Sequence, residues 1–325
     1  MGLPPGKMTL PDRVTVYEVG PRDGLQNEAD PLPAPVKIEL IERLAAAGVP
    51  VVEATSFVSP KWVPQLADAK EVMDGLTRRE GVRYPVLVPN QAGLARALET
   101  GVSEVAIFGS ATETFARKNL NRTVEESLEM FAPVVHAARE AGLRVRAYLS
   151  MAFGDPWEGV VAPAQVVRVA RRMYDLGADE LSLGDTIGVG TPAHARRLLT
   201  ELGGEIPIDV LAVHYHDTYG QALANVLASL ELGVQTIDAS VAGLGGCPYA
   251  DSATGNLATE DLVYMLNGMG IATDVNLDSV VETAWWISAC LSREPVSRVA
   301  RALGPPLGPP AVGRRRSHSS AVEGS

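Results

Sequence analysis

Short apolar runs alternate along the chain with longer segments whose apolar residues recur every three or four positions. The runs favour Val, Ile, Leu and Ala, as strands do when both faces of a parallel sheet are buried. The longer segments have the spacing of amphipathic helices, and several end at a glycine, a common residue at helix C-termini. The eight apolar runs lie at residues 13–20, 50–57, 84–90, 104–110, 143–151, 179–186, 208–217 and 235–244.

Alternation of eight strands with helices over about 250 residues predicts an α/β fold of the (β/α)8 TIM-barrel type. A doubly wound open sheet is the alternative, but such a sheet usually has fewer strands. Residues 259–269 would form the eighth helix, and two further helical segments follow at 277–292 and 295–303. The pattern therefore predicts a TIM barrel with extra C-terminal helices.

The two ends of the chain differ from its body in composition. We expect residues 1–12 to be an N-terminal extension and residues 13–303 to form one TIM-barrel domain that includes the C-terminal helices. Residues 304–325 are rich in Pro, Gly and Ser and contain a cluster of Arg. Because such a segment cannot bury enough apolar surface to order itself, we expect a disordered tail there.

Composition and charge narrow the class of protein. Of 325 residues, 46% are hydrophobic, which is enough for a full core. A net charge of −11 without a broad basic patch argues against nucleic acid as a partner. No apolar stretch reaches the roughly 18 residues that a membrane span needs. Two cysteines are too few for a disulfide scaffold, and the N-terminus has no apolar signal run, so we expect a cytoplasmic protein.

Two of the five histidines, His214 and His216, stand two positions apart in the seventh apolar run. Alternation along a strand places both on one face. The carboxyl ends of barrel strands meet at one mouth, which Asp23 reaches after the first strand and Asn256 from the last loop. Imidazole, carboxylate and amide ligands suit an open site for Mg²⁺ or Mn²⁺, whereas structural zinc prefers thiolates. The sequence therefore predicts a metal site built from these four residues.

Other polar residues end the predicted strands at the same mouth. Arg22 stands in a tight turn flanked by glycines and a proline, which can aim its guanidinium at an enolate or a carboxylate. Cys247 follows several glycines in a polar loop, so we expect a reactive thiol on a mobile loop over the mouth. Cys290 lies on an apolar helix and is expected in the core. The remaining candidates at strand ends are Gln26, Glu53, Tyr148 and Asp185.

Five longer segments carry a resemblance: "VGPRDGLQNE", "EATSFVSPKWVPQLAD", "SLGDTIGVGTP", "AVHYHDTYGQALAN" and "SVAGLGGCPYADSATGNLATEDLVYML". They resemble the 3-hydroxy-3-methylglutaryl-CoA lyase family, and the likeness runs from about residue 13 to residue 300. Synthases of the wider metal-dependent aldol/Claisen superfamily share the barrel and the His-x-His strand. Their last loop generally has no cysteine, so "GLGGCPYA" favours the lyase family.

The resemblance implies roles for individual residues of this chain. Arg22 corresponds to the arginine that steadies the thioester enolate, and Cys247 to the catalytic cysteine of a Gly-rich loop. Glu53 and Asp185 correspond to acids that are needed for full activity. The residues that correspond to the family's metal ligands are Asp23, His214, His216 and Asn256.

The resemblance also implies a reaction, the metal-dependent cleavage of 3-hydroxy-3-methylglutaryl-CoA to acetoacetate and acetyl-CoA, as in leucine degradation and ketone-body formation. Either Asp23 or His214 would take the hydroxyl proton, and Cys247 would protonate the acetyl-CoA enolate. The partner is a small acyl-CoA substrate, for which we expect contacts at Arg22, Gln26 and Tyr148. The resemblance implies a homo-oligomer, a dimer. Two alternatives stay open: a lyase for a bulkier 3-hydroxy-3-alkylglutaryl-CoA, and a non-catalytic barrel that only binds acyl-CoA.

Overall fold

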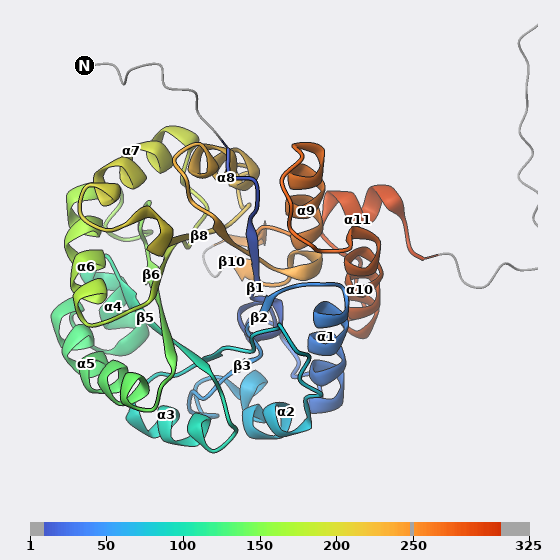
Figure 1. Ribbon diagram of the computed structural model, residues 1–325, viewed down its shortest axis with the longest axis horizontal. Helices are drawn as coiled ribbons and strands as arrows, with labels where there is room; N and C mark the ends of the chain where they lie inside the picture. Colours follow the sequence, from blue (N-terminus) through green and yellow to red (C-terminus); the bar gives the residue numbers. More distant parts are fainter. Residues whose placement is uncertain (1–9, 248–249, 307–325) are drawn as a thin grey trace, which may run out of the picture.

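In a computed structural model, the structure describes residues 10–247 and 250–306. A ring of parallel strands stands at the centre of these residues, and helices surround it (Figure 1). The strands follow one another around the ring in the order β2-β1-β9-β8-β7-β6-β5-β4-β3. The strands of this sheet are β1 (Thr15–Glu18), β2 (Val51–Val52), β3 (Thr55–Ser56), β4 (Val86–Leu87), β5 (Glu104–Ser110), β6 (Arg144–Ser150), β7 (Glu180–Asp185), β8 (Leu211–Tyr215) and β9 (Thr236–Ala239).

The second predicted strand closes the ring, although it is divided into β2 and β3. The Glu53 N–H donates to the Glu18 carbonyl of β1 at 2.8 Å, whereas the Ala54 N–H donates to the Pro85 carbonyl at 2.9 Å. The Val52 N–H also donates to the Arg83 carbonyl, at 3.0 Å, so successive residues bond alternately to β1 on one side and to the chain that leads into β4 on the other. Each of the other seven predicted runs contains one strand, so the predicted barrel is confirmed.

The helices lie outside the ring and bury the apolar stripes that predicted them. In α5, for example, the buried residues Leu128, Phe131 and Val135 recur every three or four positions, and Thr123 caps the helix together with Glu126. The helices are α1 (Ala34–Ala46), α2 (Ala69–Gly75), α3 (Gln91–Leu98), α4 (Glu113–Leu120), α5 (Val124–Glu140), α6 (Pro163–Asp175), α7 (Pro192–Gly203), α8 (Ala222–Leu230), α9 (Thr259–Gly268), α10 (Leu277–Cys290) and α11 (Arg298–Leu303).

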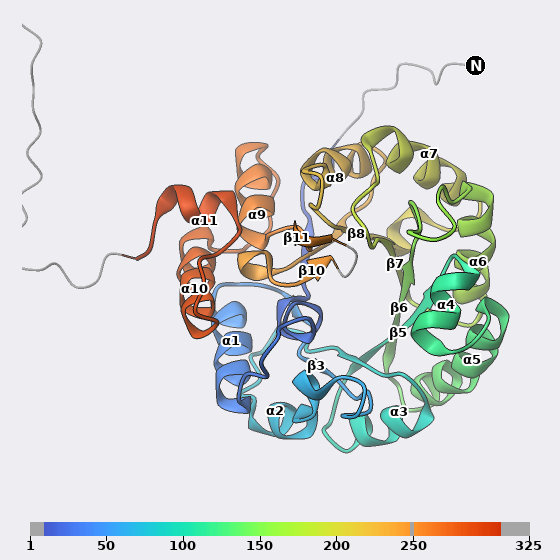
Figure 2. The same ribbon diagram turned by 180° about the vertical axis from the view of Figure 1, so that it is seen from behind.

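The extra C-terminal helices are confirmed as well. Helices α10 and α11 lie beside α1 and α9, outside the ring of barrel helices (Figures 1 and 2). The prediction for Cys290 is wrong, because this residue is exposed at the last position of α10. The buried stripe of α10 runs through Ala284 and Ile287, and Cys290 falls outside it. No helix in the described ranges is long and apolar enough to cross a membrane.

Short helical turns and one hairpin complete the architecture of the barrel. The predicted eighth strand, 235–244, is shorter than expected, because the 3-10 turn η4 begins soon after β9 ends. Residues 1–9 of the expected extension and 307–325 of the expected tail lie outside the described residues, so both remain predictions. The remaining elements are η1 (Gly20–Gly24), η2 (Pro64–Leu66), η3 (Ile208–Val210), η4 (Val241–Gly243) and the antiparallel pair β10 (Gly246–Cys247) and β11 (Ala250–Thr254).

Candidate active site

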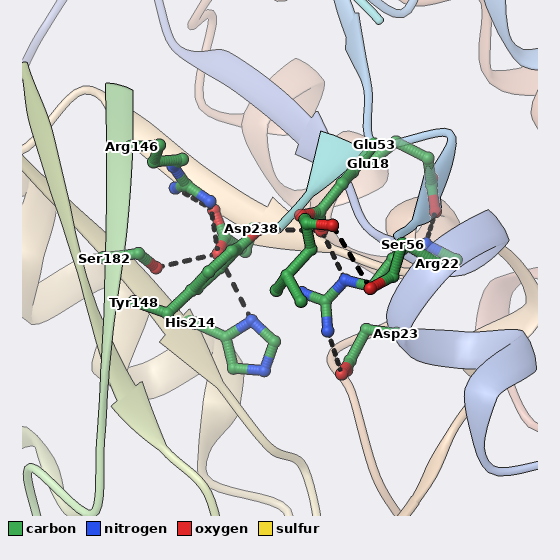
Figure 3. A network of polar contacts seen from close by, with 12 residues as sticks. Glu18, Arg22, Asp23, Glu53, Ser56, Arg146, Tyr148, Ser182, His214 and Asp238 are labelled. Atoms are coloured by element: carbon green, nitrogen blue, oxygen red, sulfur yellow. Dashed lines mark hydrogen bonds and ion pairs between the residues drawn. The ribbon is translucent and has the colours of Figure 1, made fainter. Parts of the chain in front are cut away.

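The turn after β1 carries the first two site residues. In η1, the backbone N–H groups of Arg22 and Asp23 both donate to the carbonyl of Val19, at 3.2 and 2.7 Å. Pro21 stands at the start of this turn, where its missing N–H costs nothing. The turn is therefore tight, and Figure 3 shows the side chains of Arg22 and Asp23 beside each other, joined by an ion pair.

Strand β8 brings two imidazoles to Asp23, as the alternation of the sequence predicts. One ligand atom from each of Asp23, His214 and His216 lies within 4.8 Å of the others. Tyr215, between the histidines, points the other way, and its hydroxyl lies 2.8 Å from the Ser229 hydroxyl of α8. The two histidines and the carboxylate thus form one cluster at the mouth.

Asn256, the fourth predicted ligand, reaches the same cluster from the chain after β11. It forms a backbone bridge with His216, and its Nδ2 donates to Asp23 Oδ2 at 2.8 Å. Ligation of a cation through the amide oxygen would therefore require the amide to turn. Gly245 makes room for Asn256, because a Cβ at Gly245 would lie 2.7 Å from Nδ2 and the residue has a φ of +106°.

The charges of these groups suit a cation. Burial raises the pKa of Asp23, but the Arg22 guanidinium and the neighbouring imidazoles outweigh it and lower this pKa to about 2. Burial, together with His214, lowers the pKa of His216 to about 3, so its ring is neutral at pH 7. The His216 Nδ1 atom is buried and has no hydrogen-bond partner among the described residues. A carboxylate, two imidazoles and an amide fit a divalent cation.

Arg22 is fixed beside this cluster by two carboxylates. Its Nε donates to Glu53 Oε2 and its Nη1 to Asp23 Oδ1, each at 2.8 Å. The Tyr148 hydroxyl also donates to Glu53 Oε2 at 2.8 Å, and the Arg22 guanidinium lies 5.1 Å from the Tyr148 ring centroid. Burial raises the pKa of Glu53, although Arg22 opposes this shift. The guanidinium therefore enters the site already oriented.

Asp185 is the last residue of β7, which pairs with β8 on the side opposite to β9. Its Oδ2 accepts the Gly190 N–H at 2.9 Å, within the glycine-containing loop that follows the strand. Burial raises the pKa of Asp185 to about 6, against the effect of these backbone donors and of His214. A Cβ at Gly190 would lie 2.8 Å from Asp185 Oδ2, so a larger residue there would displace the carboxylate. Asp185 thus lies at the carboxyl end of its strand, and its part in the site stays a prediction.

For two predicted residues, Gln26 and Cys247, the described part of the structure gives the position in the chain but no contact with the other site residues. Gln26 is half-buried just beyond η1. The segment of Cys247 was predicted as a loop, but Cys247 lies in β10, which pairs with β11 in a hairpin. Hydrogen bonding between the two short strands explains the difference, since the glycine-rich sequence hides the strand pattern. The position of its thiol is not among the described features, so its reactivity remains a prediction.

Comparison with known proteins identifies the family. A family model described as HMGL-like matches residues 13–287. The chain belongs to the HMGL-like family. The match spans the barrel and most of α10, which is most of the stretch that the sequence resemblance covers, and the predicted resemblance is confirmed.

Two relatives show how close members of the HMGL-like family are to this chain. Mitochondrial hydroxymethylglutaryl-CoA lyase of Rattus norvegicus is 57% identical over 294 residues, 90% of this chain and 90% of the rat protein. Cytoplasmic 3-hydroxy-3-methylglutaryl-CoA lyase of Danio rerio is 55% identical over 293 residues, 90% of this chain and 88% of the fish protein. Relatives thus carry names of two compartments, and the cytoplasmic location of this chain remains a prediction.

Solved structures of two relatives agree with the barrel. Hydroxymethylglutaryl-CoA lyase from Pseudomonas aeruginosa has a TM-score of 0.89 at 52% identity, covering 90% of this chain and 98% of that chain. An HMG-CoA lyase from Acinetobacter baumannii, solved with coenzyme A and 3-methylmalate, has a TM-score of 0.86 at 36% identity. This second likeness covers 92% of this chain and 98% of that chain. Both likenesses place this HMGL-like chain among TIM-barrel lyases.

The structure adds site residues that the sequence reading missed. Asp238 of β9 is buried and lies 3.2 Å from His214, and Ser182 of β7 donates to the same carboxylate. Burial raises the pKa of Asp238, but Arg146 and His214 outweigh it and lower this pKa below its usual range. Strand alternation could have revealed Asp238, because an acid inside an apolar strand stands out. It lies within its strand, whereas the predicted site residues were those at strand ends.

Proposed function

We propose that the chain cleaves 3-hydroxy-3-methylglutaryl-CoA to acetoacetate and acetyl-CoA. The observation that carries this function is the convergence of Asp23, His214 and His216 on one point beside the fixed Arg22. Membership of the HMGL-like family supports it, because the relatives are named for this activity. The acyl-CoA nature of the substrate agrees with the relative that was solved with coenzyme A.

Four residues would hold the divalent cation in this proposal. They are Asp23, His214, His216 and, through its amide oxygen, Asn256. Mg²⁺ or Mn²⁺ suits this donor set best, because oxygen and imidazole ligands at an open position favour these ions over structural zinc. When bound, such a cation supplies Lewis-acid chemistry that makes a coordinated substrate hydroxyl more acidic.

The residues of the chain divide the proton transfers between them. A base takes the proton of the tertiary hydroxyl, the bond between C2 and C3 breaks, and the hydroxyl-bearing carbon becomes the ketone of acetoacetate. Either Asp23 or His214 would be this base, because both belong to the cluster beside which the substrate hydroxyl would lie. The electron pair of the broken bond passes into the thioester, which becomes the enolate of acetyl-CoA.

Arg22 and Cys247 act on that enolate. Because Glu53 and Asp23 fix the Arg22 guanidinium, its charge is oriented toward the developing oxyanion without rearrangement. Cys247 donates its proton to the enolate carbon and completes acetyl-CoA. Glu53 and Asp185 act by holding neighbouring groups, and Gln26 and Tyr148 contact the substrate.

Product analysis tests this function. The purified chain is incubated with 3-hydroxy-3-methylglutaryl-CoA, and acetoacetate and acetyl-CoA are quantified. Equal amounts of the two products support the proposal, whereas binding of the thioester without cleavage would indicate a non-catalytic acyl-CoA-binding barrel. A parallel assay with 3-hydroxy-3-alkylglutaryl-CoA thioesters of larger alkyl groups measures which alkyl group the site accepts. Faster cleavage of a bulkier thioester would reassign the substrate.

Two further features belong to the proposal. A homo-oligomer, a dimer, follows from the resemblance to the lyase family, and light scattering of the purified chain measures it. The cytoplasmic location is tested by fractionation of the cells that produce the protein. Neither feature alters the chemistry that is assigned to the mouth of the barrel.

A further inference from the structure

We propose that Asp238 is a positioning residue, which sets the orientation and the tautomer of His214 from inside the barrel. Arg146 and Ser182 in turn hold the Asp238 carboxylate in place. The inference rests on the proposed function in one respect, namely that His214 is a cation ligand. It adds a buried layer of residues beneath the cluster at the mouth.

Strand register places Asp238 opposite His214. Strands β8 and β9 run parallel, and His214 pairs directly with Asp238. The side chains of both residues turn into the barrel, where His214 Nδ1 lies 3.2 Å from Asp238 Oδ2 (Figure 3). An ionised carboxylate can only accept, so Nδ1 must carry the proton of this hydrogen bond. The other ring nitrogen, Nε2, is then left with a free lone pair, and in Figure 3 it points away from Asp238.

The Asp238 carboxylate is itself held by donors from two other strands. Arg146 of β6 donates through Nη2 to Oδ1 at 2.6 Å and through Nη1 to Oδ2 at 3.1 Å. Ser182 of β7 donates its hydroxyl to Oδ2 at 2.8 Å. These bonds fix the plane of the carboxylate, so the direction in which Oδ2 meets the imidazole is fixed as well.

Burying the charge of Arg146 costs more free energy than packing alone would explain. The side chain is fully buried, lies 3.7 Å from the Tyr17 ring centroid, and donates to Glu180 as well as to Asp238. Burying such ions costs much of what their pairing gains, and apolar side chains could fill the same space. A role in positioning His214 accounts for this cost. Arg146 holds the Asp238 carboxylate, and this carboxylate reaches the candidate ligand His214.

The test compares Asp238→Asn with the wild type in two measurements. Asparagine keeps the size of the side chain but replaces one acceptor oxygen with a donor, so the Nδ1–H form of His214 loses its preference. Ring ¹⁵N shifts of His214, recorded on cation-free protein, should change from one tautomer to a mixture. Mn²⁺ affinity, measured by electron paramagnetic resonance, should fall about 10- to 100-fold, as is usual when the hydrogen-bond partner of a metal-bound histidine is removed.

Glu180→Gln is the matched control. It removes the other buried carboxylate of Arg146 but leaves the bond between Asp238 and His214. It should lower thermal stability while the His214 tautomer and the Mn²⁺ affinity stay at wild-type values. If Asp238→Asn does not fold because Arg146 is left unpaired, the double variant Asp238→Asn/Arg146→Gln removes that charge and is measured in its place.

The outcomes separate this inference from the proposed function. A folded Asp238 variant with the wild-type tautomer and wild-type Mn²⁺ affinity would overturn the positioning role. The same loss of Mn²⁺ affinity in Glu180→Gln as in Asp238→Asn would also overturn it, because the ion pairs of Arg146 would then have only a structural role. A wild type that neither binds Mn²⁺ nor cleaves the thioester would refute the proposed function, while the tautomer measurement would still decide the role of Asp238.

Discussion

Arg22 lies between the two parts of the candidate site, the cluster of cation ligands and the buried carboxylate of Glu53. It donates to Asp23 on one side and to Glu53 on the other, so its orientation is set by the protein rather than by a substrate. Charge that is fixed in this way stabilises a transition state without reorganisation. In the proposed reaction, Arg22 therefore stabilises the charge of the enolate, and Cys247 delivers its proton.

The assignment of Cys247 predicts the behaviour of Cys247→Ala. General acid catalysis contributes about 10²- to 10⁴-fold, so kcat should fall within that range. KM and Mn²⁺ affinity should change little, because the thiol acts mainly in the transition state. Steady-state kinetics with the thioester measures both constants. Cys290→Ala, a change at the exposed end of α10, serves as the control and should retain wild-type kcat. Near wild-type turnover in Cys247→Ala would show that another group delivers the proton.

Single residues could be predicted from the sequence where one strand or one turn placed them. His214 and His216 share a strand face, and Asp23 follows a strand end, so these residues were found without the structure. Asp238 stands out as an acid within an apolar strand, but its contact with His214 depends on the register between β8 and β9, which the sequence does not show. Cys290 was misplaced because one apolar helix does not reveal which of its sides a second helix covers.

At the scale of elements, the turn η4 connects the barrel with the hairpin that carries Cys247. Two buried carboxyl groups hold this turn. Glu18 accepts the Val241 N–H at 2.9 Å, and Glu260 accepts the Ala242 N–H at 2.8 Å. Ala242 has a left-handed φ of +59°, a strained conformation for a residue with a side chain. The two hydrogen bonds stabilise this strained turn, and with it the start of the hairpin.

These carboxyl groups predict a pH dependence of stability. Burial raises the pKa of Glu260 to about 8 and that of Glu18 to about 7. The folded state therefore binds protons that the unfolded state has released, and stability falls as pH rises from about 5 to about 8. Each such group contributes at most about 1.4 kcal/mol per pH unit within its window.

Glu260→Gln should flatten that dependence. The amide keeps an acceptor for the Ala242 N–H but cannot ionise, so its part of the slope disappears. Urea unfolding at a series of pH values measures the free energy of unfolding of both proteins. Glu282→Gln, an exposed change on α10, is the control and should keep the wild-type slope. Parallel pH profiles for Glu260→Gln and the wild type would contradict the account of this turn.

Elements could be predicted where hydrophobic periodicity is strong and local. The long helices and β5 to β8 appear close to their expected positions, because their apolar patterns are regular. The division of residues 50–57 into β2, which pairs with β1, and β3, which pairs with β4, was not predictable, since no local pattern marks it. The hairpin of β10 and β11 was hidden by glycines, which are poor strand formers.

At the scale of the whole molecule, the C-terminal helices are part of the barrel domain. Asp261 of α9 accepts the Ser297 hydroxyl and the Val299 N–H, both at 2.8 Å. The Val296 N–H donates to the Ala242 carbonyl of η4 at 3.1 Å. The start of α11 thus supports both the outer helices and the turn that leads to Cys247.

Two truncated chains should therefore differ sharply in melting temperature and turnover. Ending the chain after Leu303 removes the expected disordered tail, so melting temperature and turnover should stay nearly unchanged. Ending it after Pro295 also removes α11 and the Val296 contact, and it should lower both. Differential scanning calorimetry and steady-state kinetics compare the two chains with the full chain. A large loss after the shorter deletion would show that residues 304–325 dock on the barrel.

Restoration of thioester cleavage by a cation tests the central claim most directly. Wild-type protein is stripped of metal with a chelator, and acetyl-CoA release from 3-hydroxy-3-methylglutaryl-CoA is followed as Mn²⁺ is added back. The account predicts negligible release without metal and recovery at about one equivalent of Mn²⁺, the single ion that the ligand cluster can hold. His216→Ala, which lacks one ligand, should stay folded and should not recover. Full cleavage by the stripped wild type, or normal recovery of His216→Ala, would contradict the account.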